Sequence, residues 1–155
     1  MAQGCELLIA DEPTTALDVT IQAQIIELLK TLCQTRGISI IFISHDIELV
    51  AQISDRIMVM YGGMEMELNS SQKVTNNPGH PYTRALLASS PRFGSHYTQE
   101  RLTSIPGKIG EGIAEGCPFA PRCVQAKEQC FTELPPLAVK GSYEIRCWLE
   151  EKNGS

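Results

Sequence analysis

The sequence predicts an α/β fold with parallel strands, followed by a small, loop-dominated module that is rich in cysteine. Apolar, β-branched runs alternate with a stretch of helical periodicity over the first 60 residues. Parallel neighbours need a helix between them, so the order strand–helix–strand–helix–strand indicates a parallel sheet. From about residue 90, Pro, Gly and Cys become dense and the apolar periodicity fades.

The first strand and helix are the most clearly marked elements. Residues 6–11 predict a strand, and consecutive apolar residues from Leu7 to Ile9 are typical of a strand covered on both faces. A helix is expected from Val19 to Arg36, capped by Asp18 and ended by Gly37. Its apolar positions fall on one helical face: Ile21, Ile25, Leu28, Leu29 and Leu32.

The next segments complete the predicted core. Residues 38–44 form a β-branched strand, 46–53 a short helix and 56–60 a third strand. Gly62-Gly63 predicts a turn into an alternating fourth strand at 64–68, as in an antiparallel edge hairpin. The methionines here follow strand alternation, which predicts packing and not a soft-metal site: Met58, Met60, Met64 and Met66.

Helices are expected again at 70–75 and 81–88, where Pro81 suits a first helical turn. His80, which lies just before this second helix, is expected to have a structural or capping role. We therefore predict three regions: a core at 1–69, a helical connector at 70–92 and the cysteine-rich module at 93–155.

Composition and charge argue against a nucleic-acid-binding protein, a membrane-spanning segment and a signal peptide. The net charge of −5 and the absence of a Lys/Arg cluster argue against nucleic acid as the main partner. No apolar run approaches the ~20 residues that span a bilayer. The start, MAQGCELLIADEP, has neither the basic region nor the apolar region of a signal peptide.

Polar residues follow two predicted strands where each strand ends. Asp11 and Glu12 end the first, and Ser44-His45-Asp46 end the second. Chemistry collects at the carboxyl ends of parallel strands, so these side chains should share one edge. Asp11 could hold Mg²⁺ through water, Glu12 could polarise an attacking water, and His45 could contact a transferred phosphate. Taken singly, an Asp-Glu pair is more often part of a solvated turn, and a histidine at a strand end is more often a hydrogen-bonded structural residue.

Three motifs together resemble a known family. LLIADEP, TALD and IIFISHD resemble the Walker B strand, the D-loop and the H-loop of ATP-binding cassette (ABC) ATPases. The resemblance implies that Asp11 binds Mg-ATP, that Glu12 orients the attacking water and that His45 is the switch histidine near the γ-phosphate. It also implies that Asp18 crosses a dimer interface. Leu7, Leu8 and Ile9 would then be strand core.

The phosphate cradle of that family is missing from the sequence. A P-loop needs Gly-x-x-x-x-Gly-Lys-Ser/Thr. The only Gly-Lys pair is Gly107-Lys108, with Leu102 at the first glycine position and Ile109 at the Ser/Thr position. The family's Leu-Ser-Gly-Gly-Gln signature is also absent. The chain thus resembles the C-terminal portion of an ABC subunit within a partial P-loop NTPase core. We expect the chain alone to bind ATP weakly and not to hydrolyse it.

The tail holds four cysteines with the spacing Cys117-x5-Cys123-x6-Cys130-x16-Cys147. The tight pairs of zinc fingers are lacking, yet four thiolates that converge suit a [4Fe–4S] cluster or a structural Zn²⁺. Inert buried thiols are a third reading, and disulfides a fourth if the chain is oxidised. Trp148 could shield a metal centre. No role is assigned to Cys5 or Cys33.

The tail also carries a resemblance. NPGHPYTRALLASSP and the later IPGKIGEGIAEGCPFAPRC resemble the C-terminal extension of the peptide-importer branch of ABC ATPases. The resemblance implies a [4Fe–4S] cluster on the four cysteines, with Zn²⁺ as the alternative. Tyr143 stands where that branch often has His.

The family implies a function and partners. The expected function is an ATP-binding and ATP-hydrolysing subunit that couples hydrolysis to oligopeptide or dipeptide import. Expected partners are a second ABC subunit in a homo- or heterodimer, transmembrane permease subunits and, indirectly, an extracytoplasmic peptide-binding protein. The expected location is peripheral, on the cytoplasmic face of the membrane. The alternative is a truncated, inactive cassette that acts only as a metal-cluster or interaction module.

Overall fold

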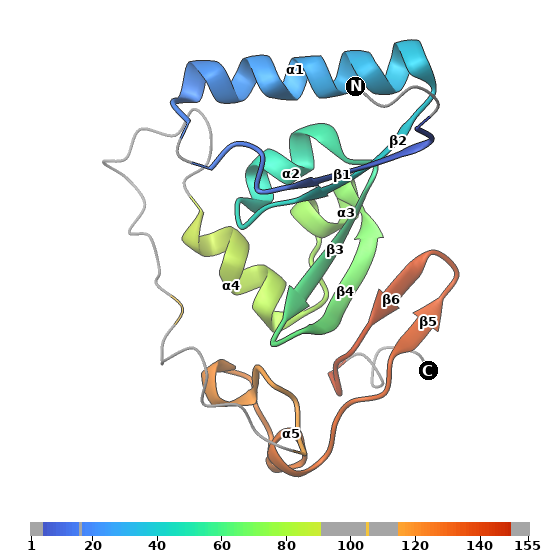
Figure 1. The fold of residues 1–155 in the computed structure, drawn as a ribbon. Coiled ribbons are helices and arrows are strands. Elements are labelled where there is room, and N and C mark those ends of the chain that lie inside the picture. The colour runs from blue at the N-terminus through green and yellow to red at the C-terminus, as the bar shows by residue number, and fades with distance from the viewer. Residues whose placement is uncertain (1–4, 16, 91–104, 106–114, 150–155) are drawn as a thin grey trace. The chain divides into compact units, whose positions relative to one another are not determined.

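The computed structural model describes residues 5–15, 17–90, 105 and 115–149 (Figure 1). The chain divides into two compact units, Met1–Ser54 and Asp55–Ser155, and each is described by itself. Among the described residues, no helix has the length and apolar character needed to cross a membrane.

The first unit pairs a parallel two-stranded sheet with two helices. β1 and β2 run in parallel, with Leu7 opposite Ser39 and Asp11 opposite Ile43. The helix between the two strands provides the crossover that a parallel pair requires, as the sequence predicts. The elements, in chain order, are β1 (Leu7–Asp11), α1 (Val19–Arg36), β2 (Ser39–Ile43) and α2 (Ile47–Ile53).

Local capping fixes the ends of these helices. Asp18 is the N-cap of α1, and its carboxylate accepts a hydrogen bond from the Ile21 amide at 2.9 Å. Gly37 ends α1 in the left-handed region, with φ 64°. Asp46 caps α2 by accepting from two amides of its first turn. The predicted boundaries of α1 are therefore confirmed. They could be predicted because Asp and Gly are residues that commonly cap helices at these two ends.

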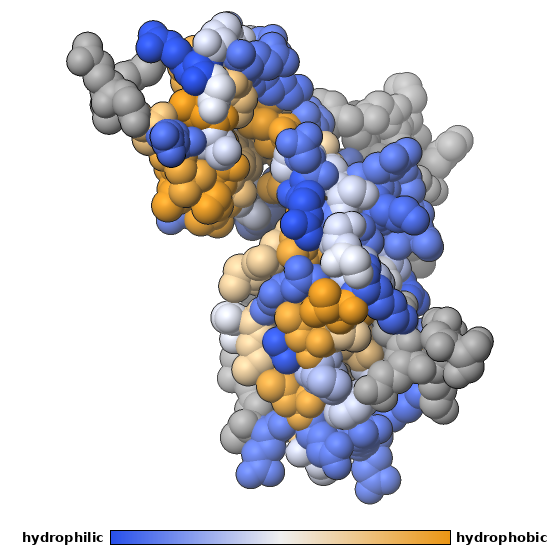
Figure 2. All heavy atoms as spheres, turned by 90° about the vertical axis from the view of Figure 1, so that its right-hand side faces the viewer, coloured by the Kyte–Doolittle hydropathy of each residue, from blue (hydrophilic) through white to orange (hydrophobic). Residues whose placement is uncertain are grey.

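One face of the β1–β2 sheet is apolar and open to solvent. Leu7 is 47% exposed and Ile9 62%, and two residues of β2, Ile41 and Ile43, are also exposed. The prediction that Leu7 and Ile9 form strand core was therefore wrong, because in the described structure this face lies open to water. Figure 2 shows apolar side chains gathered over one side of this first unit, at upper left.

The second unit is built on an antiparallel four-stranded sheet with the strand order β3-β4-β6-β5. β6 pairs with β4 through Glu67 opposite Ile145. The elements are β3 (Arg56–Tyr61), β4 (Met64–Ser70), α3 (Ser71–Asn76), α4 (Pro81–Ser89), the 3₁₀ turn η1 (Ala120–Arg122), α5 (Glu128–Thr132), β5 (Ala138–Lys140) and β6 (Tyr143–Ile145). Two short strands of the cysteine-rich tail thus extend a sheet that the sequence predicts only as a hairpin.

β3 corrects one part of the predicted topology. The sequence predicts it as a further parallel strand, but β3 pairs antiparallel with β4 and belongs to a different sheet from β1 and β2. The turn between β3 and β4 is Gly62-Gly63, with φ 58° and 78°, values that favour glycine. A two-residue turn holds neighbouring strands together locally, so the hairpin forms without a crossover.

The core of this unit is formed by side chains of the sheet and of the tail segment around η1. Met66, Phe119 and Ile145 are almost fully buried. The rings of Tyr61 and Tyr82 pack edge-on, 4.8 Å apart between centroids, and both contact Phe119. Such aromatic contacts favour one arrangement of the tail against the hairpin.

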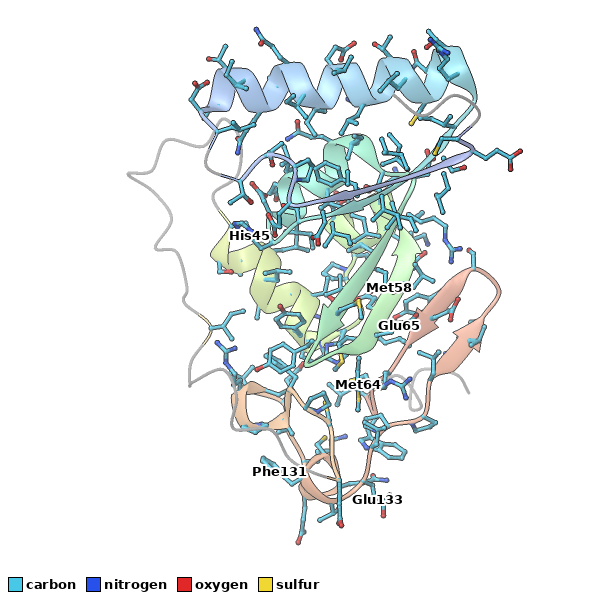
Figure 3. The ribbon with its side chains drawn as sticks, viewed as in Figure 1. His45, Met58, Met64, Glu65, Phe131 and Glu133 are labelled. Carbon is cyan, nitrogen blue, oxygen red and sulfur yellow. The ribbon has the colours of Figure 1, made fainter. Side chains whose placement is uncertain are left out.

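The prediction that the methionines pack was correct for Met66 and wrong for the other three. Met58, Met60 and Met64 are between 38% and 54% exposed. In β3 the alternate positions, Ile57 and Val59, are the buried ones. Figure 3 marks Met58 and Met64 on this hairpin, beside Glu65.

Candidate functional site

Glu12 and His45 meet at the carboxyl ends of β1 and β2. The Nδ1 atom of His45 lies 2.9 Å from Oε1 of Glu12, and the His45 amide donates to the same oxygen at 3.0 Å. A carboxylate oxygen only accepts, so Nδ1 carries the hydrogen of this bond. The predicted convergence of these two residues is therefore found, within one unit of the structure. Figure 3 labels His45.

The backbone of Glu12 is held in an uncommon conformation. Its φ of 46° is the only positive φ found on a described non-glycine residue. The Glu12 amide donates to the Ile43 carbonyl at 2.9 Å, and its own carbonyl accepts from the Thr15 amide at 3.2 Å. A non-glycine residue in this region costs about 1–3 kcal/mol and persists where the surroundings fix it. Strain of this kind is typical of functional sites.

The electrostatics of the pair favour an ion pair. The hydrogen bond from His45, followed by the one from Thr15, lowers the pKa of Glu12. The hydrogen bond to Glu12, followed by its charge, raises the pKa of His45. The His45 side chain is 80% exposed and the Glu12 side chain 36%. The site is thus charged, accessible and ordered by hydrogen bonds.

Thr15 is a site residue that the sequence reasoning missed. Its hydroxyl donates to Oε2 of Glu12 at 2.8 Å, so both oxygens of this carboxylate are held. The sequence spacing could have indicated this contact, because a Thr three residues after an acidic residue can donate its hydroxyl to that carboxylate within a turn. The neighbouring Thr14 is buried and its carbonyl accepts from the Gln22 side chain at 3.3 Å.

The other two predicted residues of this region take no part in the hydrogen bonds of the pair. Asp11 is the last residue of β1 and is exposed. Asp18 is occupied as the cap of α1. In the described part of the chain, no hydrogen bond or ion pair joins either of them to Glu12 or His45. Their expected roles in magnesium binding and at a dimer interface stay predictions.

The four tail cysteines line one cavity of the second unit. Cys117, Cys123, Cys130 and Cys147 all line it, and all four are unbridged. The rest of the lining includes Phe119, Pro135 and Trp148. The thiols therefore converge across a spacing that the sequence alone left ambiguous. Within the described ranges, no three Cys, His, Asp or Glu side chains gather closely enough to form a metal-binding group.

Backbone amides are directed at each of these sulfurs. Burial has the larger effect on the pKa of three of these thiols, and backbone hydrogen bonds act against it: from Phe119 and Ala120 at Cys117, from Gln125 at Cys123 and from Leu149 at Cys147. The Lys127 amide lies 3.4 Å from the Sγ of Cys130. Amides that point at sulfur stabilise a thiolate in preference to a thiol.

Burial works against the free thiolates. It raises the pKa of Cys117 and Cys123, and it raises the pKa of Cys147 to about 11. Four thiolates in one apolar cavity would also repel each other. Thiolates would be stable in this cavity only beside a cationic group that supplies the missing positive charge.

Two further residues border the same cavity. His80 is buried, and its Nδ1 accepts from the Tyr82 amide at 3.0 Å as the cap of α4, which confirms the predicted structural role. Burial lowers the pKa of His80 to about 4, so it is neutral. Trp148 lines the cavity and donates from Nε1 to the Glu133 carbonyl at 3.3 Å. The stretch IPGKIGEGIAEG of the tail lies largely outside the described residues.

Comparisons with known proteins identify a matching family model and similar relatives. A family model described as "Oligopeptide/dipeptide transporter, C-terminal region" matches residues 66–130. The chain is 44% identical over 153 residues to the oligopeptide transport ATP-binding protein AppD of Bacillus subtilis, covering 97% of this chain and 46% of that protein. It is 47% identical over 154 residues to a putative peptide import ATP-binding protein of Brucella ovis, covering 93% of this chain and 45% of that protein. The chain thus spans about half the length of these relatives.

Proposed function

This chain belongs to the ABC transporter ATP-binding subunits of the oligopeptide/dipeptide importer branch, as a C-terminal portion of one, and we propose that it supplies the water-orienting part of their ATP-hydrolysing site. The contact between Glu12 and His45 carries this proposal. In it, Glu12 orients the water that attacks the γ-phosphate, and His45 contacts that phosphate. Asp11, at the end of β1, would hold Mg²⁺ through the ion's own waters.

The protonation states of the pair support these roles. A carboxylate with a lowered pKa is a weak proton acceptor but a fixed hydrogen-bond acceptor, which suits orienting a water. His45 has a raised pKa, so a larger fraction of it is protonated near neutral pH. Because Nδ1 is held by Glu12, the other ring nitrogen of the exposed side chain is left to donate to a phosphate oxygen.

The remaining parts of the site come from outside this sequence. No Gly-x-x-x-x-Gly-Lys-Ser/Thr segment occurs in the 155 residues, so nothing here wraps the phosphates. We therefore propose that the chain alone binds ATP weakly and does not turn it over. In a whole subunit it would act with a second ABC subunit, across whose interface Asp18 would reach, and with membrane permeases at the cytoplasmic face.

A chimera tests the catalytic proposal. The chain is joined to the N-terminal portion of the Bacillus subtilis relative, which it does not cover, and ATP hydrolysis is measured alongside the chain alone. We expect hydrolysis from the chimera and none from the chain. Glu12→Gln should reduce the chimera's rate by about a hundredfold or more while ATP binding remains.

A matched variant makes this test specific. Glu27→Gln removes the same charge from an exposed position of α1 and should leave the rate unchanged. A folded chimera that binds ATP and hydrolyses it equally well with Glu12→Gln would exclude the assigned role. A folded chimera with no hydrolysis at all would favour the alternative, an inactive cassette.

A second proposal concerns the thiol cavity. We infer that Cys117, Cys123, Cys130 and Cys147 hold a [4Fe–4S] cluster, with Zn²⁺ as the alternative. The support is the single cavity and the amides directed at the sulfurs. Such a group would link the segment that bears Cys117 and Cys123 to the segment after β6 that bears Cys147, because ligation free energy becomes folding free energy.

Anaerobic purification tests this assignment. A cluster gives a brown protein with absorbance near 400 nm and about four irons per chain. Cys123→Ser should remove the colour, whereas Cys33→Ser, on α1, should not. Stoichiometric zinc without iron would select the alternative, and neither metal under anaerobic conditions would contradict both.

A further inference from the structure

The second unit carries a polar groove that no assigned role explains. It is open to solvent and has a volume of about 510 Å³. Its walls come from β4, from α3 and the loop after it, from α4 and from the turn between β5 and β6. The polar residues that line it are Asn69, Lys73, Asn77, Arg84, Ser142 and Tyr143.

The charge of this groove is one-sided. Two of its lining residues, Lys73 and Arg84, are cations, and no lining residue is an acid. A third cation, Arg56, donates to the carbonyl of Ser142 at 2.8 Å and so stands at the groove wall. The whole chain has a net charge of −5. A positive concave surface on an acidic protein concentrates anions locally.

Arg84 is fixed in place before any ligand arrives. Its Nε donates to the Pro78 carbonyl at 3.1 Å, and one terminal nitrogen donates to the Gly79 carbonyl at 2.7 Å. Each terminal nitrogen of a guanidinium has two hydrogens, so donors remain beyond these bonds. A guanidinium that is already ordered loses less entropy on binding an oxyanion.

Lys73 and Asn69 add unsatisfied donors. Lys73 is exposed, and the described residues include no hydrogen-bond acceptor or ion-pair partner for its ammonium. Asn69 uses its carbonyl oxygen to accept from the Ser70 amide at 2.8 Å, which leaves its NH₂ group as a donor. The groove thus presents a cation with free donors beside an ordered guanidinium and a side-chain amide.

A buried acid, Glu67, is bonded to the backbone of Gly79, which lines the groove. The carboxylate of Glu67 accepts from the Gly79 amide at 2.8 Å and from the His80 amide at 3.0 Å. Glu67 is 1% exposed and does not line the groove. Through these two bonds it fixes the loop that bears the groove.

We propose that this groove binds an oxyanion, the carboxylate or phosphate group of a small molecule, through Lys73 and Arg84. Charge-assisted hydrogen bonds from both cations hold the anion, and the Asn69 amide adds a neutral donor. The proposal is independent of the ATP site, since every residue it uses lies in the second unit.

Titration of the full chain with inorganic phosphate tests the proposal. Amide chemical shifts are followed by NMR at constant ionic strength, with chloride as the exchanged anion. We expect saturable shifts confined to the segments that line the groove. Lys73→Gln should weaken binding by about tenfold or more, the effect of losing one charge-assisted bond. Lys30→Gln, the same change on α1, should have no effect.

Two peptides identify the source of the oxyanion. A dipeptide with a free carboxylate and its C-terminal amide are titrated in the same way. If the dipeptide with a free carboxylate binds more strongly than both phosphate and the amide, the ligand is a carboxylate. If phosphate binds more strongly than the dipeptide, the ligand is a phosphate. Circular dichroism establishes that Lys73→Gln is folded. If Lys73→Gln is not folded, the location of the wild-type chemical-shift changes decides whether the anion binds at the groove.

The proposal is overturned by either of two results. One is that neither phosphate nor the free carboxylate gives saturable shifts at the groove. The other is that Lys73→Gln and Lys30→Gln weaken binding equally, which would mean that the anion responds only to net charge.

Discussion

Nδ1 of His45 lies 2.9 Å from Oε1 of Glu12, although 33 positions separate these residues in the sequence. The parallel register of β1 and β2 explains this contact, because it places Asp11 opposite Ile43 and so brings the two strand ends together. A salt bridge this exposed contributes little to stability. Its value is in setting the charge and orientation of the two side chains.

The pair should show a defined dependence on pH. The pKa of Glu12 is lowered from 4.5, so its contribution is present above that value and is lost as the pH falls through the folded pKa. The pKa of His45 is raised from 6.5, so its contribution is present below that value and is lost as the pH rises through the folded pKa.

NMR titration of the imidazoles measures this effect. In Glu12→Gln the pKa of His45 should fall back towards 6.5, while Glu27→Gln should leave it raised. His80, which is buried and has a pKa of about 4, should not change in either variant. An unchanged His45 titration in Glu12→Gln would show that the contact is absent in solution.

The positive φ of Glu12 predicts a difference between two substitutions. Glycine adopts φ 46° without strain and alanine does not, and neither residue keeps the carboxylate. We expect Glu12→Gly to be more stable than Glu12→Ala by about 1 kcal/mol, measured by urea unfolding. Equal stabilities would mean that the turn relaxes and that the strain at this position is not retained.

Gly79 should not tolerate a side chain. A Cβ placed there would overlap the Tyr143 hydroxyl and lie 2.9 Å from Cδ1 of Ile145, a fully buried residue. Gly79→Ala should therefore destabilise the chain by about 1–3 kcal/mol, the usual effect of overpacking. In a Tyr143→Phe background, which removes the nearest atom, the same change should cost less. A cost that is the same in both backgrounds would assign the clash to Ile145.

Asp18 allows its structural and functional roles to be separated. Asp18→Ala removes the acceptor for the Ile21 amide and should cost about 1 kcal/mol, whereas Asp18→Ser keeps an N-cap and should cost much less. Unfolding of the purified chain gives both values. If the chimera loses ATP hydrolysis with Asp18→Ser at unchanged stability, the carboxylate itself acts at the predicted interface.

Local features of the fold were predictable, and features that depend on distant partners were not. The caps at Asp18 and Gly37 fix α1 through residues next to it in sequence. Leu7 and Ile9 are exposed because no other part of the described structure covers them. A local sequence pattern cannot reveal whether a covering element is present. The pairing of β3 was misjudged for a related reason, since apolar alternation identifies a strand but not its neighbour.

The candidate site divides in the same way. Glu12 and His45 were found because parallel strands end at a common edge. Thr15 was missed because its role depends on a turn geometry, and the convergence of the four cysteines could not be derived from loose spacing. The regions proposed as 1–69, 70–92 and 93–155 stay predictions.

Trp148 is the single tryptophan of the chain, and it borders the thiol cavity. Its indole fluorescence therefore originates at one place, beside the four sulfurs, and iron or a cluster there would quench it by energy and electron transfer. Emission intensity then reports how full the cavity is during purification, oxidation or chelation. The protein has an optical probe of its own tail without any label.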